Sequence, residues 1–436
     1  MSVKEYIKQY GKEPTSWDEE RLKKLEATEL PRGYIVPRGG LGSLDAQGQV
    51  QLAKEVQEWL ESRVAHYKQL RGGVVCIDAI PKRPVFRGRS SARFCAIELE
   101  KRSQFSVPSF SGIQEGHLIL VEQAGVTYKD VIGVPGKFES IVSRHGMNAV
   151  RVRVWTASTY NITYALEMEK RIKEAGLTLM VDLHYSDNWA DPGKQYQPVA
   201  WGTTVPELTV NIYNYTRDVV LAFAAQGTPI DVLQTGNEIN SGLLWPTGEN
   251  TTPQGWANVA TYLHAAREGA RAARFGGKVM IHLANGWDQP GATWWWSNAL
   301  AQGTYDLNGV DLMGFSFYPF YGTSATYANL SLSLNTIANT YDKPILVAET
   351  DYPATPWNGT ALSQEFPNTP KGQEDWVSGI VNVLDSLPRG LGQGILYWEP
   401  GWVGPASLGS SCADNLVFVE TGNARTSVNI FDIMRA

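Results

Sequence analysis

The chain has 436 residues, of which 43% are hydrophobic and 19% are charged, with 42 Gly and 23 Pro. These values are ordinary for a globular protein and exclude a collagen-like, coiled-coil or wholly disordered chain. The net charge of −6, without a basic stripe interleaved with aromatic residues, argues against a nucleic-acid partner. No apolar run approaches the ~20 residues that a membrane span needs, so we expect no membrane partner.

Charge and tryptophan are distributed unevenly along the chain. Residues 1–110 hold 19 Lys and Arg against 14 Asp and Glu, whereas residues 111–436 hold 19 against 30. Thirteen of the 15 Trp follow residue 150. We therefore expect two parts, an N-terminal extension over residues 1–110 and a folded domain over residues 111–436.

The N-terminal extension contains helix-like segments at residues 17–27 and 49–67 and an apolar run at residues 73–80. Its start lacks the apolar core of a signal peptide. Residues 29–36, 64–74 and 77–82 carry a resemblance to the C-terminal subdomain of acyl-CoA and 4-coumarate-CoA ligases, over about residues 26–82. The ligase nucleotide-binding domain is absent from the sequence, so we expect this fragment to be non-functional.

From residue 140 onward, short apolar runs alternate with segments whose apolar residues recur at three- and four-residue spacing. The helical segments include residues 164–175, 207–225, 255–273 and 371–387. The predicted strands cover residues 149–155, 178–184, 230–235, 279–283, 312–318, 345–349 and 395–399. Repeated strand and helix units of this kind predict parallel strands, and seven of them favour an α/β fold of the (β/α)8 TIM-barrel type with an atypical N-terminal extension.

The first strand of this barrel is the weakest prediction. The apolar run Leu118-Ile119-Leu120-Val121 is the nearest candidate, and residues 93–99 are the alternative. We expect residues 118–121 to pair with the strand at 149–155 on one side and the strand at 395–399 on the other. Gly116-His117 leads directly into this run, as though several residues were missing before it.

Two glutamates end two of the predicted strands, Glu238 after residues 230–235 and Glu349 at residues 345–349. The carboxyl ends of barrel strands form one face, so these acids can converge although they are far apart in the chain. Hydrolysis of a glycosidic bond needs a proton donor and a second carboxylate. The pair therefore indicates a glycosidase, whereas either residue alone would fit a salt-bridged strand end equally well.

Aromatic residues lie at the same ends of the predicted strands. Trp155, Trp189, Tyr318 and Trp398 fall at or just after strand ends, where flat rings can stack on the apolar faces of sugars. One such ring alone more often packs in a core. Four of them at one end of a barrel favour a sugar-binding cleft.

Residues 116–433 resemble glycoside hydrolase family 53, the endo-β-1,4-galactanases. The resemblance is carried by Arg-Val-Arg-Val-Trp at 151–155, Asp-Leu-His-Tyr-Ser-Asp-Asn-Trp at 182–189, Gly-Asn-Glu-Ile at 236–239 and Tyr-Trp-Glu-Pro at 397–400. It implies a retaining endo-hydrolase of galactan side chains of pectin, with Glu238 as acid/base and Glu349 as nucleophile. It also implies that Arg153 holds the nucleophile charged and that Asn237 binds the sugar 2-hydroxyl.

The resemblance further implies which residues line the substrate cleft. They are Arg153, Asp182, His184, Asp187, Trp189, Asn237, His282, Tyr318 and Trp398. His184, Asp187 and His282 lack the spacing of a known metal site, so we expect no metal and no cofactor. The family also implies a monomeric, extracellular enzyme, which five N-glycosylation triplets suit, and a disulfide partner for Cys412 that residues 352–370 do not contain.

Two other functions remain open on the sequence. A damaged first strand could leave a barrel that binds galactan without cleaving it. The two glutamates would also serve a retaining hydrolase of xylan, mannan or another β-1,4-glycan, since the chemistry does not specify the polymer.

Overall fold

The computed structural model describes residues 42–44, 50–52, 110–356, 361–403 and 415–435. The chain divides into two compact units, Met1–Phe105 and Ser106–Ala436. In the first unit, strands β1 (Gly42–Leu44) and β2 (Val50–Leu52) pair antiparallel. The segments that resemble a ligase and the three cysteines lie outside the described residues.

The second unit is a closed barrel of eight parallel strands. Their order around the barrel is β10-β3-β4-β5-β6-β7-β8-β9, which closes where β9 pairs with β10. The strands are β3 (Phe110–Gln114), β4 (Ala149–Val154), β5 (Thr178–Leu183), β6 (Val232–Thr235), β7 (Lys278–Leu283), β8 (Leu312–Ser316), β9 (Ile345–Thr350) and β10 (Gly392–Trp398). The predicted TIM barrel is therefore confirmed.

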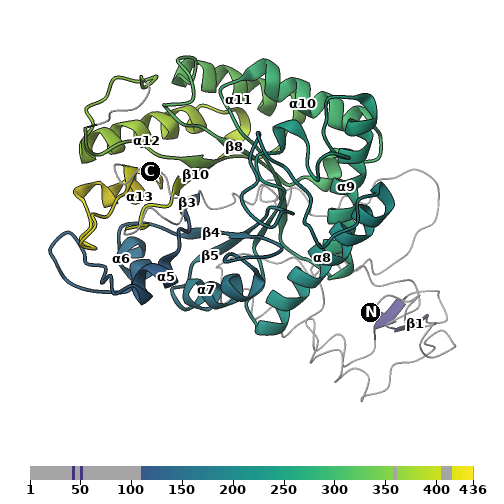
Figure 1. Cartoon of the computed structure of the whole chain (residues 1–436), viewed down its shortest axis with the longest axis horizontal. Helices are drawn as coiled ribbons and strands as arrows, with labels where there is room; N and C mark the ends of the chain where they lie inside the picture. Colours follow the sequence, from purple (N-terminus) through teal and green to yellow (C-terminus); the bar gives the residue numbers. More distant parts are fainter. Residues whose placement is uncertain (1–41, 45–49, 53–109, 357–360, 404–414, 436) are drawn as a thin grey trace. The chain divides into compact units, whose positions relative to one another are not determined.

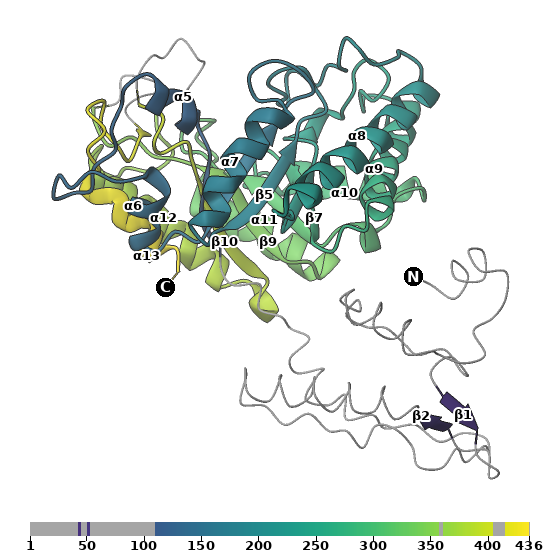
Figure 2. The ribbon, with the colours of Figure 1, turned by 90° about the horizontal axis from the view of Figure 1, so that it is seen from below.

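Helices surround the strands on the outside, with α7 and α8 neighbouring each other (Figures 1 and 2). They are α5 (Leu118–Gln123), α6 (Phe138–Arg144), α7 (Ile162–Glu174), α8 (Val205–Gln226), α9 (Pro253–Ala272), α10 (Gln289–Ala301), α11 (Tyr327–Tyr341), α12 (Pro370–Asp385) and α13 (Ile430–Ile433). Among the described helices, none is both long and apolar enough to span a bilayer.

The long helices begin at residues whose side chains accept a backbone N–H of the first turn. These capping residues are Asn161, Thr204, Asp288, Thr252, Thr326 and Thr369 for α7, α8, α10, α9, α11 and α12. At α8 the cap is reciprocal, because the Glu207 carboxylate accepts the backbone N–H of Thr204. Such caps each stabilise a helix by about 1 kcal/mol, so the local sequence defines where each helix starts.

The first strand of the barrel is not the predicted one. Leu118–Gln123 forms helix α5, which buries Leu118, Ile119 and Val121. The strand is Phe110–Gln114, and it lies between β10 and β4, where we expected the first strand. A short apolar run is compatible with either a helix or a strand, and β3 gives a weak strand signal because it has only five residues and contains Gly112. All eight strands of the barrel are present among the described residues.

Alternate residues of each strand face the interior of the barrel. One layer of this interior, below the carboxyl-terminal half of the barrel, is apolar. It consists of Phe110, Ala149, Met180, Val232, Met280, Leu312, Leu346, Ala348 and Leu396. Side chains on the opposite faces of the strands pack against the helices. On β4 these side chains are Val150, Val152 and Val154. Each fully buried side chain of this size contributes about 1.5–3 kcal/mol, so the apolar layers stabilise a platform for the polar residues above them.

Candidate active site

Polar side chains form the next layer of the barrel interior, because every second residue of a strand faces inward. Residues two positions further along the strands are Arg151 on β4, Asp182 on β5, Gln234 on β6 and His282 on β7. All four side chains are buried. Because the strands are parallel, these side chains form one layer at the carboxyl-terminal half of the barrel.

Arg151 lies at the centre of this layer, donates hydrogen bonds to four neighbours and forms an ion pair with a fifth. Its Nη1 is 2.6 Å from Gln114 Oε1 and 2.9 Å from Glu349 Oε1. Its Nε is 2.9 Å from Gln234 Oε1, and its Nη2 is 2.7 Å from Asn237 Oδ1. An ion pair of 3.0 Å joins Nη2 to Asp182 Oδ2. This guanidinium therefore connects five strands or strand ends through charge-assisted hydrogen bonds and one ion pair.

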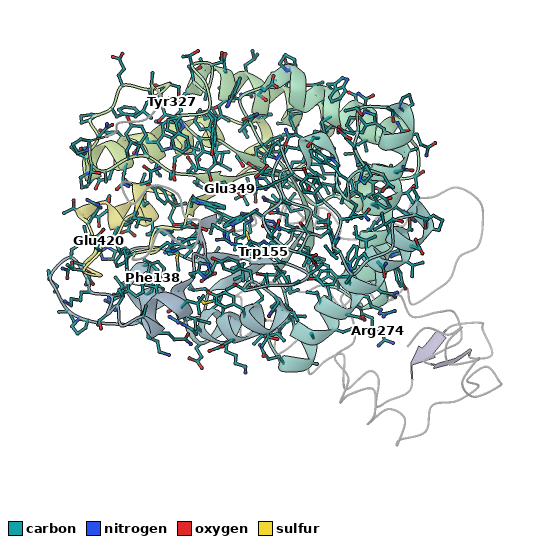
Figure 3. The ribbon with its side chains drawn as sticks, viewed as in Figure 1. Phe138, Trp155, Arg274, Tyr327, Glu349 and Glu420 are labelled. Carbon is teal, nitrogen blue, oxygen red and sulfur yellow. The ribbon has the colours of Figure 1, made fainter. Side chains whose placement is uncertain are left out.

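Glu349 reaches the interior through an irregularity in β9. Phe315 of β8 pairs with Val347, but the next residue, Ser316, pairs with Glu349, so Ala348 is an extra residue in β9. An extra residue of this kind changes the direction in which the following side chain points. Ala348 and Glu349 consequently both face inward, and Glu349 lies in the middle of the ring of elements (Figure 3).

The Glu349 carboxyl is held by protein groups on both oxygens. Arg151 donates to Oε1, and the Tyr318 hydroxyl donates to Oε2 at 3.1 Å. Burial raises the pKa of Glu349, and the Arg151 charge and the Tyr318 hydrogen bond oppose that shift. These two donors favour the ionised carboxylate.

Glu238 follows β6 in a tight turn. Gly236 has φ of 89°, and Glu238 itself has φ of 47°, a left-handed conformation that is uncommon for a residue with a side chain. The Cβ of any other residue at position 236 would lie 2.7 Å from Ile239 Cγ2. Strained backbone of this kind is often found at functional sites, and here it aims the Glu238 carboxyl back across the barrel toward Ser316.

Glu238 and Glu349 differ in the groups that stabilise or oppose their charge. Burial, together with the nearby charge of Glu349, raises the pKa of Glu238 to about 8. No cation contacts Glu238 as Arg151 contacts Glu349 within the described residues. Arg151 and Tyr318 therefore favour the ionised form of Glu349, whereas burial and the charge of Glu349 favour the protonated form of Glu238, a difference of the kind that acid/base chemistry requires.

Asn237 and His282 complete the buried network. Asn237 Oδ1 accepts from Arg151, and its Nδ2 donates to Ala190 O at 2.8 Å. His282 Nδ1 lies 2.8 Å from Asn237 Oδ1, and its Nε2 lies 3.0 Å from Ser316 Oγ. His282 is fully buried.

Hydrogen bonds of Asp182, His184 and Asp187 stabilise the polar layer and the loop after β5. Asp182 Oδ2 accepts from His184 Nε2 at 2.9 Å, and His184 Nδ1 accepts the backbone N–H of Ala190. Burial opposes the charge on Asp182, but Arg151 and His184 outweigh it and hold the pKa of Asp182 at about 2. Asp187 accepts from the Thr156 hydroxyl and from the Val199 N–H.

Arg153 does not contact the carboxyl group where it was expected. It forms an ion pair with Glu399 and donates to the backbone carbonyl of Glu115. Its guanidinium lies 4.3 Å from the Trp189 ring centroid and 5.2 Å from that of Trp398. The expectation that Arg153 holds Glu349 charged is wrong. Arg151 and Arg153 face the same side of β4, but Arg151 contacts Glu349 and Arg153 contacts Glu399.

Aromatic rings border the polar layer. Trp189 and Trp398 are partly exposed, with ring centroids 6.0 Å apart. Trp155 is buried against Tyr160 and Trp189. Tyr321, which the sequence reasoning did not single out, is 62% exposed and packs against Tyr318. No metal-binding cluster of His, Cys, Asp or Glu occurs among the described residues.

The fold and this site together define a class of enzyme, the glycoside hydrolases of the barrel type. The chain matches the model of glycosyl hydrolase family 53 over residues 110–431. Curated relatives named arabinogalactan endo-β-1,4-galactanase, from Thermothelomyces thermophilus and Humicola insolens, are 40% and 39% identical. Each alignment covers 74% of this chain and 98% of the relative.

Solved structures agree with this match. A structure reported for two fungal β-1,4-galactanases has a TM-score of 0.70 and 40% identity, over 74% of this chain and 98% of that chain. The family 53 catalytic domain of Ignisphaera aggregans has a TM-score of 0.68 and 26% identity, over 75% of this chain and 96% of that one. The chain belongs to glycosyl hydrolase family 53.

Proposed function

We propose that this enzyme hydrolyses β-1,4-galactosidic bonds within galactan, including arabinogalactan side chains of pectin, and retains the anomeric configuration. The observation that carries the proposal is the pair Glu238 and Glu349, which lie in one barrel mouth in environments that favour opposite protonation states. The names of the relatives, each matched over 98% of its length, support galactan as the polymer.

In the first step the Glu349 carboxylate attacks the anomeric carbon, and the bond from that carbon to the leaving oxygen breaks. Glu238 donates its proton to that oxygen. In the second step the ionised Glu238 removes a proton from water, the water oxygen bonds to the anomeric carbon, and Glu349 departs as carboxylate. Retention follows because two displacements each invert the anomeric centre.

Arg151, rather than Arg153, supports the nucleophile in this mechanism. Its hydrogen bond to Glu349 Oε1 is matched by the Tyr318 hydroxyl on Oε2. The Asn237 amide uses one N–H on Ala190 O, so its second N–H is available to the sugar 2-hydroxyl. Such a hydrogen bond strengthens as positive charge develops on the sugar ring.

Sugar rings would contact the aromatic border of the site. Trp189, Trp398 and Tyr321 are partly or largely exposed and offer ring surfaces for stacking. Asp182, His184 and His282 are buried and satisfied by protein groups. We propose that these three position Arg151, Asn237 and the loop after β5, while the rings contact the polymer.

The test is the release of reducing ends from galactan by the purified protein, compared with xylan and mannan. We expect the highest initial rate on galactan and no turnover by Glu349→Gln, which keeps the side-chain shape without the nucleophile. Binding of galactan without release of reducing ends would instead indicate a non-catalytic barrel. A higher rate on xylan or mannan would reject galactan as the substrate.

We also infer that the enzyme acts outside the cell, because a polymeric substrate does not cross a membrane. Four of the five N-glycosylation triplets fall on described residues, Asn161, Asn214, Asn250 and Asn329, and the fifth, at Asn358, does not. Asn250 is buried and donates to Asn240 O, so a glycan there would disrupt the fold. Glycopeptide mass spectrometry of the secreted protein should find glycans at the other positions and none at Asn250.

A further inference from the structure

A chain of hydrogen bonds links Glu238 to the interior of the barrel through Ser316 and His282. Glu238 Oε1 lies within hydrogen-bond distance of Ser316 Oγ. Ser316 Oγ is 3.0 Å from His282 Nε2, and His282 Nδ1 is 2.8 Å from Asn237 Oδ1. Ser316 and His282 are both buried. Since each hydrogen can be donated only once, the direction of this chain can be derived from its far end.

The Asn237 amide has only one orientation that satisfies its neighbours. Its oxygen faces Arg151 Nη2 at 2.7 Å, and a guanidinium nitrogen only donates. Its nitrogen faces Ala190 O at 2.8 Å, and a carbonyl oxygen only accepts. His282 Nδ1 therefore faces an acceptor at 2.8 Å, which favours a hydrogen on Nδ1.

Two donors also lie near His282 Nδ1, but both have closer acceptors. Arg151 Nη2, at 3.2 Å, donates over a shorter distance to Asn237 Oδ1, at 2.7 Å, and forms an ion pair of 3.0 Å with Asp182 Oδ2. Gln234 Nε2, at 3.3 Å, donates to Asp182 Oδ1 at 2.6 Å and to Gly236 O at 2.9 Å. Both nitrogens lie closer to other acceptors than to His282 Nδ1, and the shortest polar contact of Nδ1 is to the acceptor Asn237 Oδ1 at 2.8 Å, so we assign the ring hydrogen to Nδ1.

The Nε2 atom of His282 consequently carries no hydrogen and can only accept a hydrogen bond. Burial and the adjacent charge of Arg151 lower the pKa of His282 well below its usual value, so the ring is neutral. A neutral ring with its hydrogen on Nδ1 has a lone pair on Nε2. The neighbouring atom at 3.0 Å is Ser316 Oγ, which has one hydrogen to give.

We propose that Ser316 donates its hydrogen to His282 and presents only lone pairs to Glu238, so that Ser316 and His282 are positioning residues that hold Glu238 in its protonated form. The inference rests on the proposed role of Glu238 as the proton donor. A Ser316 hydroxyl that donated to an ionised Glu238 would instead lower the proton affinity of that carboxyl group. When Glu238 ionises, the Ser316 hydroxyl must rotate toward it and break its bond to His282.

Other charged or titratable groups also face Glu238. They are Glu349 on β9, Arg151 on β4, Asp191 in the loop after β5, and Tyr318 and Tyr321 after β8. All of them remain in a Ser316→Ala variant. A change in the proton affinity of Glu238 in that variant therefore reports on Ser316 rather than on its surroundings.

The first test is the pH dependence of kcat/KM for wild type, Ser316→Ala and Ser333→Ala. Ser333 is a matched control, because it is a buried serine on α11 whose hydroxyl has no hydrogen-bond partner in the described structure. We expect the alkaline limb of Ser316→Ala to move to lower pH by about half to one pH unit, and that of Ser333→Ala to stay. An unchanged limb, a shift to higher pH, or an equal shift in Ser333→Ala would overturn the proposal.

The second test uses the wild-type protein without substrate. The chain has six His, so the ring nitrogens of histidine-labelled protein can be followed by 15N NMR and His282 assigned from a His282→Gln variant. We expect His282 to stay neutral with its hydrogen on Nδ1, and a hydrogen on Nε2 would overturn the proposal. Absence of galactan hydrolysis would reject the proposed substrate but would not change this readout, so the two failures are distinguishable.

Discussion

At the scale of single residues, two identical side chains have different properties because their neighbours differ. Glu349 is bonded to Arg151 and Tyr318, whereas Glu238 faces Ser316 and the charge of Glu349. The residues that flank Glu238 and Glu349 in the sequence do not reveal these neighbours. The difference arises from β4 and β8, which bring Arg151 and Ser316 to the two carboxyl groups.

This difference predicts the pH profile of the enzyme. Glu238 must be protonated to act as the acid, and burial with the Glu349 charge raises its pKa to about 8. We expect kcat/KM on galactan to fall as the pH rises through about 8, because the acid form is lost there. Initial rates between pH 4 and pH 10 would measure this limb. A decline centred near the usual carboxyl value would show that the environment of Glu238 does not raise its pKa.

The sequence predicts the two glutamates but not the residue that holds the nucleophile. Glu238 and Glu349 were predictable because strand ends of a parallel barrel share one face. Arg151 and Arg153 both point inward from β4, and only the depth of each along the barrel decides which carboxyl group it meets. The extra residue Ala348 in β9, which directs Glu349 inward, leaves no recognisable signal in the sequence.

At the scale of elements, helices α7, α8, α9 and α12 and seven of the strands follow from periodicity, while β3 and α5 do not. The sequence of β3, Phe-Ser-Gly-Ile-Gln, has a polar residue at every second or third position and only five residues. What makes it a strand is tertiary, since Gly112 lies against Ala149 of β4 and Leu396 of β10. Packing of this kind overrides the local preference that favours the more apolar run at residues 118–121.

The close packing at Gly112 makes it a sensitive position. A Cβ there would lie 2.4 Å from Leu396 Cδ2 and 2.8 Å from the Ala149 carbonyl oxygen, which belongs to the backbone and cannot move aside. We expect Gly112→Ala to lower the free energy of unfolding by ~1–3 kcal/mol. Gly276→Ala is the control, because nothing lies within 4 Å of a Cβ at Gly276. Denaturant unfolding measures both, and equal stability of the two variants would contradict the packing of β3.

Helix α7 contains a buried carboxyl group that links stability to pH. Glu169 is buried and accepts from the Thr228 hydroxyl at 2.7 Å, and burial raises the pKa of Glu169 from 4.5 to about 8. The folded state therefore binds this proton more tightly than the unfolded state. Its contribution to stability is complete below about pH 4.5 and is lost as the pH rises through about 8.

The variant Glu169→Gln removes this dependence, since an amide does not titrate. We expect the variant to lose less stability than wild type between pH 5 and pH 9, by roughly 1–3 kcal/mol. Glu167→Gln, on an exposed position of the same helix, is the control. Unfolding free energies measured at both pH values test this, and parallel curves for wild type and Glu169→Gln would contradict it.

At the scale of the whole molecule, the family match and the barrel begin at the same residue. The match covers residues 110–431, and β3 starts at Phe110, inside the unit Ser106–Ala436. All residues of the proposed site lie in that unit. We therefore propose that the N-terminal extension takes no part in catalysis. We also propose that the barrel acts as a monomer.

Two truncations test this division. Removing residues 1–105 should leave the rate on galactan within a few-fold of the full chain, because the barrel keeps all eight strands. Removing residues 1–114 also deletes β3 and leaves β4 and β10 with unpaired edges, so we expect no soluble monomer. Loss of soluble protein in the shorter truncation would show that the N-terminal part stabilises the barrel.

The assignment of Glu349 as nucleophile and Glu238 as acid/base is tested most directly by trapping the covalent intermediate. Glu238→Ala should still react with an aryl β-galactobioside whose leaving group needs no proton, but it lacks the base that activates water. A glycosyl-enzyme should therefore accumulate. Peptide mass spectrometry should find the sugar on Glu349, and a sugar attached to any other residue, or no adduct while the aryl group is released, would contradict the account.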